Sequence, residues 1–369
     1  MAKRNQFSVG LTVGLAIVFL LIGCCVGFLG AAVYDASKTH SDEAPPVMVE
    51  GELQIHFLEL GNKYTGDCTY IKAGDTDILI DAGSRSSSVE TISAYLKDYV
   101  TDDILEYVVI THAHQDHYAG FAMKEGGIFD LYECKNIIDF GEQTNQEDKG
   151  TNLYGKYVDA RDAEIAAGAS YYPAPDHAKR EFDLGGGIKM TILDSYYYYN
   201  KAASENDYSV CTLLTYGSYK YLFTGDLEED GEQYLISEEY NDPDLLRDVH
   251  LYKAGHHGSK TSSSAEFLEV ISPEIVCVCC CAGSPEYTKT NENMFPTQQF
   301  IDRVAPYTEK VYVTTLCVDY DAGTFTSMNG NITVVTTASG IEVVCSNDGR
   351  PLKEWDWFKQ NRKCPAAWQ

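Results

Sequence analysis

The sequence is most informative at Thr111-His112-Ala113-His114-Gln115-Asp116-His117, which follows the apolar run 107–110. That run is rich in Val and Ile and predicts a strand, so the polar stretch is a loop at the end of the strand. Three imidazoles and one carboxylate lie within six residues, and they are ligands of the kind and number that zinc prefers. Clustered histidines without apolar partners have little reason to lie in a hydrophobic core. The stretch therefore predicts a metal site with His112, His114, Asp116 and His117 as candidate ligands.

Two later segments repeat the pattern of an apolar strand that ends in a metal-binding side chain. The run 221–224 leads into Gly225-Asp226, and the run 251–254 leads into Gly255-His256-His257-Gly258. A Gly-Asp turn after a strand is usually only a turn, but its position after the histidine loop makes Asp226 a candidate ligand. We expect His256 to bind the metal because it comes first after its strand. His257 would then meet the substrate, although the sequence alone leaves the choice between the two histidines open.

In this order the three segments resemble the metallo-β-lactamase superfamily, and most of all the hydrolase domain of ComEC-type DNA-internalisation proteins. Further matches are the segments 57–61, 66–67, 78–83, 257–264, 296–297 and 330–334, together with Asn206, Ser209 and Thr314. The resemblance spans residues 52–344. The many-helix membrane channel of ComEC proteins has no counterpart in this sequence, so the resemblance does not extend to DNA uptake.

The resemblance implies an α/β fold, a four-layer αββα metallo-β-lactamase sandwich, which we expect to follow an N-terminal transmembrane helix. The expected division is a signal anchor or transmembrane segment at 1–34, a tether at 35–50, the hydrolase domain at 51–346 and a C-terminal tail at 347–369. Within the domain, strand-like and helical patterns alternate without a long linker, which favours one sandwich over two separate domains.

The resemblance also implies roles for the candidate ligands. His112 and His114 would hold a first metal ion, Asp116 and His117 a second, and Asp226 would bridge them, with His256 or His257 completing the second site. Asp81 would orient the histidine loop, as metal-bound imidazoles usually require. The candidates for substrate contact are Asn206, Ser209, Ser259 and Lys260.

The sequence departs from the superfamily pattern at one position. Many members supply a further histidine for the first metal between the histidine loop and the Gly-Asp turn. Here the only histidine in that interval is His177, which does not follow a strand. The number of metal ions, one or two, therefore stays open.

A metal-dependent hydrolase is the function that the resemblance implies, with Zn²⁺ as the expected cofactor and Mn²⁺ as an alternative. The metal would generate hydroxide at neutral pH, with Asp116 and Asp226 as the catalytic carboxylates. We favour small-molecule or polymeric phosphoesters as substrates, because the ComEC branch is associated with phosphate chemistry and Ser259-Lys260 offers hydrogen-bond donors. The alternatives are hydrolysis of a lactone, amide or thioester, or a surface binding module without activity; the intact ligand set opposes the last.

The first forty residues differ from the rest of the chain. Lys3 and Arg4 precede an uncharged run, 7–33, of 27 residues, which exceeds the ~20 that a helix needs to cross a membrane. Positive charge before this run predicts a single-pass membrane protein with an extracellular catalytic domain. Two alternatives also export the domain: lipidation at Cys24, because residues 21–24 resemble a bacterial lipobox, or secretion after signal-peptide cleavage.

Charge and cysteine usage narrow the expectations further. The chain carries a net charge of −27, and such an acidic body is not expected to bind nucleic acid stably, although a metal can invert the local field. Four cysteines fall in the apolar run 275–282: Cys277, Cys279, Cys280 and Cys281. We expect a buried strand there rather than a zinc site, because adjacent strand residues point to opposite faces and cannot converge on one ion.

Overall fold

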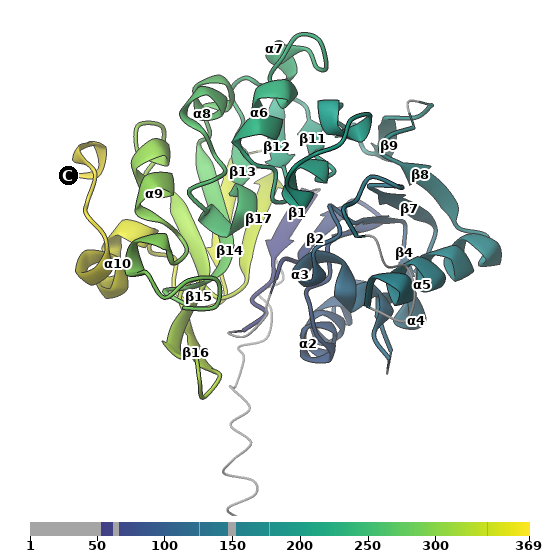
Figure 1. Ribbon diagram of the computed structural model, residues 1–369, viewed down its shortest axis with the longest axis horizontal. Coiled ribbons are helices and arrows are strands. Elements are labelled where there is room, and N and C mark those ends of the chain that lie inside the picture. The colour runs from purple at the N-terminus through teal and green to yellow at the C-terminus, as the bar shows by residue number, and fades with distance from the viewer. Residues whose placement is uncertain (1–52, 62–65, 125, 147–152, 177, 338) are drawn as a thin grey trace, which may run out of the picture. The chain divides into compact units, whose positions relative to one another are not determined.

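Two eight-stranded mixed sheets form the centre of the fold. The computed structural model describes residues 53–61, 66–124, 126–146, 153–176, 178–337 and 339–369, all within one compact unit that spans residues 47–369 (Figure 1). The expected transmembrane segment 1–34 and tether 35–50 lie outside the described residues. In the part of the chain that the structure describes, none of the helices has the length and apolar character to cross a membrane.

The first sheet has the strand order β18-β17-β1-β2-β3-β5-β7-β8. Its strands are β1 (Leu53–Phe57), β2 (Thr69–Ala73), β3 (Thr76–Ile80), β5 (Tyr107–Val109), β7 (Asn136–Asp139), β8 (Ser170–Pro173), β17 (Ile332–Thr337) and β18 (Gly340–Cys345). From β3 to β8 neighbouring strands are parallel, whereas the others pair antiparallel. A separate parallel pair joins β4 (Ile104–Leu105) to β6 (Glu133–Cys134).

The second sheet has the strand order β16-β15-β14-β13-β12-β11-β10-β9. Its strands are β9 (Glu181–Gly185), β10 (Ile188–Ile192), β11 (Thr212–Tyr216), β12 (Tyr219–Phe223), β13 (Leu251–Lys253), β14 (Ile275–Ala282), β15 (Val311–Asp319) and β16 (Thr324–Ser327). The strands β12 to β15 run parallel, so their carboxyl ends meet at one edge.

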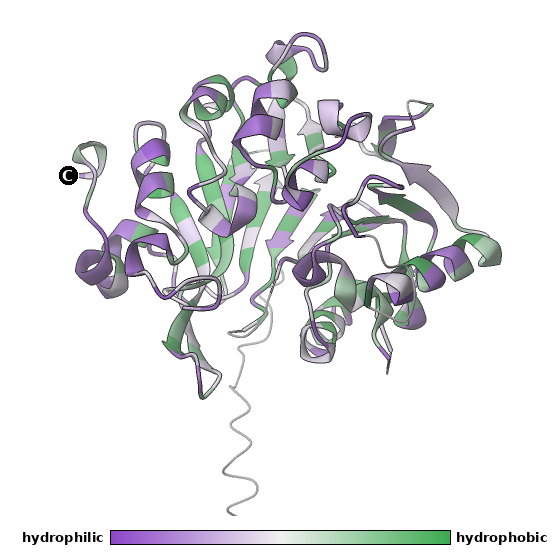
Figure 2. Cartoon of the chain, viewed as in Figure 1, coloured by the Kyte–Doolittle hydropathy of each residue, from purple (hydrophilic) through white to green (hydrophobic). Residues whose placement is uncertain are grey.

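Helices cover the outer face of each sheet (Figure 1). Beside the first sheet lie α2 (Ser86–Leu96), α3 (Gln115–Tyr118), α4 (Ile128–Leu131) and α5 (Leu153–Ala167); beside the second lie α6 (Glu229–Leu235), α7 (Pro243–Leu246), α8 (Ala265–Ile271) and α9 (Gln298–Val304). Hydrophobic residues concentrate on the strands between the helices, and the helices carry both hydrophobic and hydrophilic residues (Figure 2). The expected metallo-β-lactamase sandwich, two sheets between two helical layers, is confirmed.

Two apolar clusters explain why the layers hold together. The larger one fills the space between the sheets, where the rings of Phe57 and Phe223 lie 6.3 Å apart, and it continues beneath α2 and α5. The smaller one lies between the second sheet and its helices and includes Leu222, Phe267 and Phe300. Every residue of β14 is buried. Cys277 and Cys279 belong to the first cluster and Cys280 to the second, so the expectation of a buried cysteine-rich strand is confirmed.

The segment after β7 also belongs to the sandwich. The helix α5 follows β7, and the next strand, β8, pairs parallel with β7. The helix makes this connection possible, since a parallel strand requires a crossover of about a dozen residues or more.

The last residues of the chain also pack onto the domain. The helix α10 (Asp356–Asn361) contributes Phe358 to the second apolar cluster, and Leu352 and Trp368 join the same cluster. Residues after 346 therefore extend the core of the second sheet.

Candidate metal centre

The candidate ligands come from both sheets and meet at one end of the sandwich. The histidine loop follows β5, Asp226 follows β12, and His257 lies in the short 3₁₀ turn η4 (Gly255–Gly258) that follows β13. A backbone hydrogen bond of 2.8 Å from the amide of Val210 to the carbonyl of Thr111 joins the two halves at this end. The site is thus fixed by strand ends, as in other open α/β arrangements.

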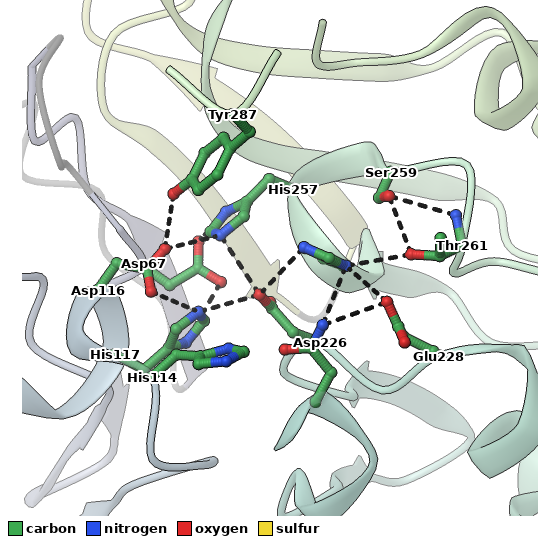
Figure 3. Close-up of polar contacts among 12 residues, drawn as sticks. Asp67, His114, Asp116, His117, Asp226, Glu228, His257, Ser259, Thr261 and Tyr287 are labelled. Carbon is green, nitrogen blue, oxygen red and sulfur yellow. Dashed lines mark hydrogen bonds and ion pairs between the residues drawn. The ribbon is translucent and has the colours of Figure 1, made fainter. Parts of the chain in front are cut away.

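Three side chains form the centre of the site. The Nε2 atom of His117 lies 3.2 Å from Oδ2 of Asp226, and Nε2 of His257 lies 3.4 Å from the same oxygen (Figure 3). All three residues are buried. Asp67, His117, Asp226 and His257 each offer one ligand atom, and these four atoms lie within 4.8 Å of one another.

The outer nitrogens of both imidazoles determine the protonation of the inner ones. Nδ1 of His117 lies 2.8 Å from the carboxylate of Asp81, and Nδ1 of His257 lies 2.9 Å from the carbonyl oxygen of Cys279. Both partners are acceptors, so each Nδ1 carries the hydrogen and each neutral ring directs the lone pair of Nε2 towards Asp226. Two nitrogen lone pairs and a carboxylate facing one point require a cation between them, or a proton on each ring.

The charges around this point also indicate that a cation or additional protons are needed there. Burial works against ionisation of His117 and His257, but Asp226 and other carboxylates raise the pKa of both imidazoles well above the ordinary value. Burial also works against the charge on Asp226, yet the same imidazoles hold the pKa of that carboxyl well below its ordinary value. The carboxylates at this point exceed the fixed positive charge, which a divalent cation would balance. Imidazole and carboxylate are also the donors that zinc binds, so the residues fit a metal ion.

Asp67 and Lys253 form a buried ion pair beside the centre. Both side chains are at most 3% exposed, and Oδ1 of Asp67 lies 3.2 Å from Nδ1 of His257. Gly66 lets the chain before Asp67 pass close to the backbone of Asp116, because a Cβ atom there would lie 1.8 Å from the carbonyl oxygen of Asp116. The pair thus holds Asp67 next to both central imidazoles.

Asp116 lies on the more exposed side of the centre. Its Oδ2 atom is 3.4 Å from Nε2 of His257 and accepts a hydrogen bond of 2.8 Å from the hydroxyl of Tyr287 (Figure 3). Its side chain is 18% exposed, compared with 3% for Asp226. Asp116 is therefore the carboxylate of the centre that meets solvent most directly.

His112 and His114 lie beside the centre. The Nε2 atom of His112 is 3.0 Å from Nδ1 of His114, and the rings of His112 and His117 lie 4.3 Å apart. Burial lowers the pKa of both imidazoles, which favours the neutral form that binds metals. His112 and His114, which we expected to hold a first metal ion, thus lie next to the residues that we expected to hold a second ion.

Asp81 holds the histidine loop from behind. Its carboxylate accepts hydrogen bonds from the amide of Thr111 at 2.9 Å and the hydroxyl of Thr111 at 2.8 Å, besides that from His117. The residue has a φ of 58°, a left-handed conformation that Asp and Asn tolerate better than most residues. This geometry is the one expected of a residue that orients the loop.

The geometry favours His257 over His256, contrary to the preference from the sequence. Nδ1 of His256 lies 3.4 Å from Oε1 of Glu228 and 3.2 Å from the hydroxyl of Thr261, while Nε2 is 4.0 Å from Asp226. Both histidines have left-handed backbone angles, with φ of 46° and 55°, so the chain turns sharply after β13. The turn directs the second imidazole into the centre, which strand order could not reveal.

The four candidates for substrate contact have different surroundings. Asn206 donates to Glu228 at 3.2 Å and belongs to the polar group around His256. The hydroxyl of Ser259 lies 3.0 Å from that of Thr261 in the same group. Ser209 is fully buried and accepts a 3.1 Å hydrogen bond from the amide of Asp226, so it supports that ligand. The ammonium of Lys260 instead contacts Asn293 at 3.1 Å. His177 lies outside the described residues.

Four residues of the site had no role assigned from the sequence: Asp67, Lys253, Glu228 and Tyr287. Gly66-Asp67 matched the family pattern and Lys253 precedes the Gly-His-His turn, so both had a weak signal. Tyr287 reaches Asp116 across 171 residues of sequence, which no local pattern predicts.

Comparisons with known proteins show which family the chain resembles. The model of the metallo-beta-lactamase superfamily matches residues 61–282. ComE operon protein 3 of Bacillus subtilis is 38% identical over 72 residues, which cover 20% of this chain and 9% of that protein. Recombination protein 2 of Haemophilus influenzae is 23% identical over 227 residues, or 61% of this chain and 24% of that protein. The chain thus spans less than a quarter of either relative, and both support the resemblance to ComEC-type proteins.

Among solved structures, the metallo-beta-lactamase fold protein YhfI of Bacillus subtilis shares 10% identity at a TM-score of 0.40, covering 71% of this chain and 95% of its own. The short form of human tRNase Z shares 13% identity at a TM-score of 0.34, covering 61% and 91%. The superfamily match covers well over half of the chain. The protein therefore belongs to the metallo-β-lactamase superfamily.

Proposed function

We propose that this protein is a metal-dependent hydrolase of phosphoesters. The observation that carries the proposal is the convergence of Nε2 of His117 and Nε2 of His257 on Oδ2 of Asp226, at 3.2 and 3.4 Å. Both rings are held by hydrogen bonds on their far side, so the arrangement is built for a cation.

A bound divalent ion, which we expect to be Zn²⁺ or Mn²⁺, would lower the pKa of water enough to supply hydroxide at neutral pH. His117, Asp226 and His257 would hold this ion, with Asp67 beside them. His112 and His114 are the groups available to a second ion. Asp116, the more exposed carboxylate, is positioned to orient the attacking water and to accept its proton.

The polar group around His256 supports phosphoesters as substrates. Glu228 holds Asn206, His256 and Thr261 in place by accepting their hydrogen bonds, and Nε2 of His256 lies 4.0 Å from Asp226. Burial opposes the charge on Glu228, but hydrogen bonds from His256, Thr261 and Asn206 lower the pKa of this carboxyl to about 2. This polar group is thus fixed next to Asp226, where the substrate would bind, and the likeness to ComEC-type proteins points to phosphate chemistry.

The test uses full-length protein purified in detergent, stripped with EDTA and reloaded with Zn²⁺ or Mn²⁺. We expect metal-dependent hydrolysis of bis(4-nitrophenyl) phosphate and a loss of at least about 100-fold in Asp226→Asn. The exposed Asp230→Asn, four residues further on, is the matched control and should retain full activity. Cleavage of 4-nitrophenyl acetate, a lactone or a thioester in preference to phosphoesters would contradict the substrate class. Bound metal without hydrolysis of any ester would favour a binding module.

We also propose that the segment 7–33 anchors the protein in the cell membrane with the hydrolase domain outside. Its uncharged length and the preceding Lys3 and Arg4 support this orientation. Protease added to intact cells should remove the domain. When cells that produce the Cys24→Ser variant are fractionated, the variant should stay in the membrane fraction. Release of that variant would indicate lipidation at Cys24, and recovery of the protein in the medium would indicate cleavage.

A further inference from the structure

The loop between β14 and α9, residues 283–297, reaches the metal centre and is held at both ends. The amide of Gly283 donates to the carbonyl of Phe295 at 2.9 Å, and the amide of Thr297 donates to the carbonyl of Gly258 at 2.9 Å. Arg362, at the end of α10, donates to two carbonyl oxygens of this loop at 3.0 and 2.7 Å. The C-terminal residues thus fix the loop beside His257.

Tyr287 is the residue of this loop that enters the site. Its hydroxyl donates to Oδ2 of Asp116 at 2.8 Å, and its ring lies nearly parallel to that of His257, at 15° and 6.3 Å between centroids (Figure 3). Phe295 packs against it at 5.2 Å. Even so, 54% of the residue is exposed. A hydrogen bond therefore holds an aromatic ring in solvent, one side chain away from the metal centre.

We propose that Tyr287 is a specificity-determining residue that stacks on a planar aromatic group, such as a nucleobase, carried by the substrate next to its phosphoester. This proposal depends on the proposed function in one respect only, namely that the substrate carries a phosphoester. The hydroxyl of Tyr287 also positions Asp116.

A planar partner suits this arrangement better than other groups. The ring lies nearly parallel to that of His257 and packs against Phe295, while more than half of the residue is exposed, so the exposed part of the ring suits a single flat partner. A quaternary ammonium group is usually held by several aromatic faces. Every nucleobase has a π face, and stacking of one base on one aromatic side chain is a common mode of recognition. A base stacked here would place its phosphate near Asp116 and Asp226.

The experiment measures binding to zinc-loaded full-length protein by calorimetry, so it does not depend on turnover. The probes are thymidine 5′-monophosphate, phenyl phosphate, methyl phosphate and phosphocholine. We expect the wild type to bind the thymidine and phenyl probes about tenfold more tightly than methyl phosphate, and Tyr287→Ala to remove that difference. A larger preference for thymidine than for phenyl would identify a nucleobase as the partner.

Two further variants separate the ring from the hydroxyl. Tyr287→Phe keeps the ring and should keep the aromatic preference, but it should lower kcat for bis(4-nitrophenyl) phosphate, because Asp116 loses the hydrogen bond that positions it. Tyr199→Ala is the matched control, because Tyr199 is also a partly exposed tyrosine that donates to a carboxylate, that of Asp194 at 2.7 Å. Tyr199→Ala should change neither the aromatic preference nor kcat.

Several outcomes would overturn the proposal: equal affinity of the wild type for the thymidine and methyl probes, no binding of either, tighter binding of phosphocholine than of the aromatic probes, or a preference that survives in Tyr287→Ala. Aromatic preference without hydrolysis of any ester would contradict only the hydrolase proposal. Hydrolysis without aromatic preference would contradict only the role of Tyr287.

Discussion

Single backbone angles determine much of the metal centre. Asp81 directs one carboxylate at both Thr111 and His117 from a left-handed conformation with a φ of 58°. The same holds for His257, which reaches Asp226 because it and its predecessor are left-handed. Such angles are strained for most residues and persist only where the surroundings hold them.

Replacing Asp81 by Asn should weaken metal binding without unfolding the protein. Asn also tolerates the left-handed conformation, but its neutral oxygen holds Nδ1–H of His117 less strongly than a carboxylate does. Loss of such a partner costs about 10- to 100-fold in metal affinity. A chelator competition assay measures this change. Asp103→Asn, at an exposed residue with the same φ of 58°, should bind zinc like the wild type.

The two adjacent histidines should respond differently to replacement. His257→Ala removes a nitrogen that faces Asp226 at 3.4 Å, so zinc affinity should fall by at least about tenfold. His256→Ala removes a donor held by Glu228, so zinc affinity should persist while KM for phosphoesters rises. Zinc titration and steady-state kinetics on both variants check this assignment. Equal loss of zinc in both would return His256 to the ligand set.

These residues show how far sequence reasoning reaches. The histidine loop and Asp226 could be predicted because each follows an apolar strand directly. An apolar run followed by a metal-binding side chain is a pattern that is visible in the local sequence. The choice between His256 and His257 depends on two backbone angles that the sequence does not express. Asp67 and Tyr287 reach the centre only through tertiary packing, so their contacts could not be predicted.

At the scale of elements, strands with continuous apolar runs were predicted well, because burial on both faces leaves a clear signature. The structure confirms β14 as a buried strand, and every one of its residues is buried. The strand β8 has no buried residue and leaves no such signature. Short elements such as β8 are half-exposed and polar in part, so their signal is weak.

The helix α6 is tied to the segment before α8 by one buried carboxyl, and this contact should make stability depend on pH. Glu232 accepts hydrogen bonds from the amides of Ser263 and Ser264 at 2.5 and 2.7 Å. Burial nevertheless raises the pKa of Glu232 from 4.5 to about 7. Between these values the folded state binds the proton more tightly than the unfolded chain, so the free energy of unfolding falls as pH rises, by about 3 kcal/mol across the window.

Denaturant unfolding at pH 4.5 and pH 7.5 tests this contact. Other groups titrate in the same range, so the relevant quantity is the difference between the wild type and Glu232→Gln. Gln does not ionise, and the variant should lose this part of the pH dependence. Glu229→Gln, at an exposed residue of the same helix, should keep it. Parallel pH profiles for the wild type and Glu232→Gln would show that the carboxyl has an ordinary pKa.

On the scale of the whole molecule, the metal centre joins the two sheets. Asp67 and His117 belong to the half built on the first sheet, and Asp226 and His257 to the half built on the second. Without a cation, buried carboxylates face one another across this junction in a chain of net charge −27. A divalent ion would therefore act as a crosslink between the halves as well as a cofactor.

Zinc should accordingly stabilise the whole domain. A ligand that binds only the folded state at about 1,000 times its Kd adds about 4 kcal/mol, which corresponds to a rise of about 5–10 °C in Tm for a domain of this size. Differential scanning calorimetry of full-length protein with EDTA and with added Zn²⁺ measures the shift. Asp226→Asn, which removes the oxygen faced by both imidazoles, should lose most of it, whereas Asp230→Asn should retain it. A Tm unchanged by zinc in the wild type would mean that the imidazoles and carboxylates at the junction are held together by protons alone, and the proposed hydrolytic mechanism would fail with that result.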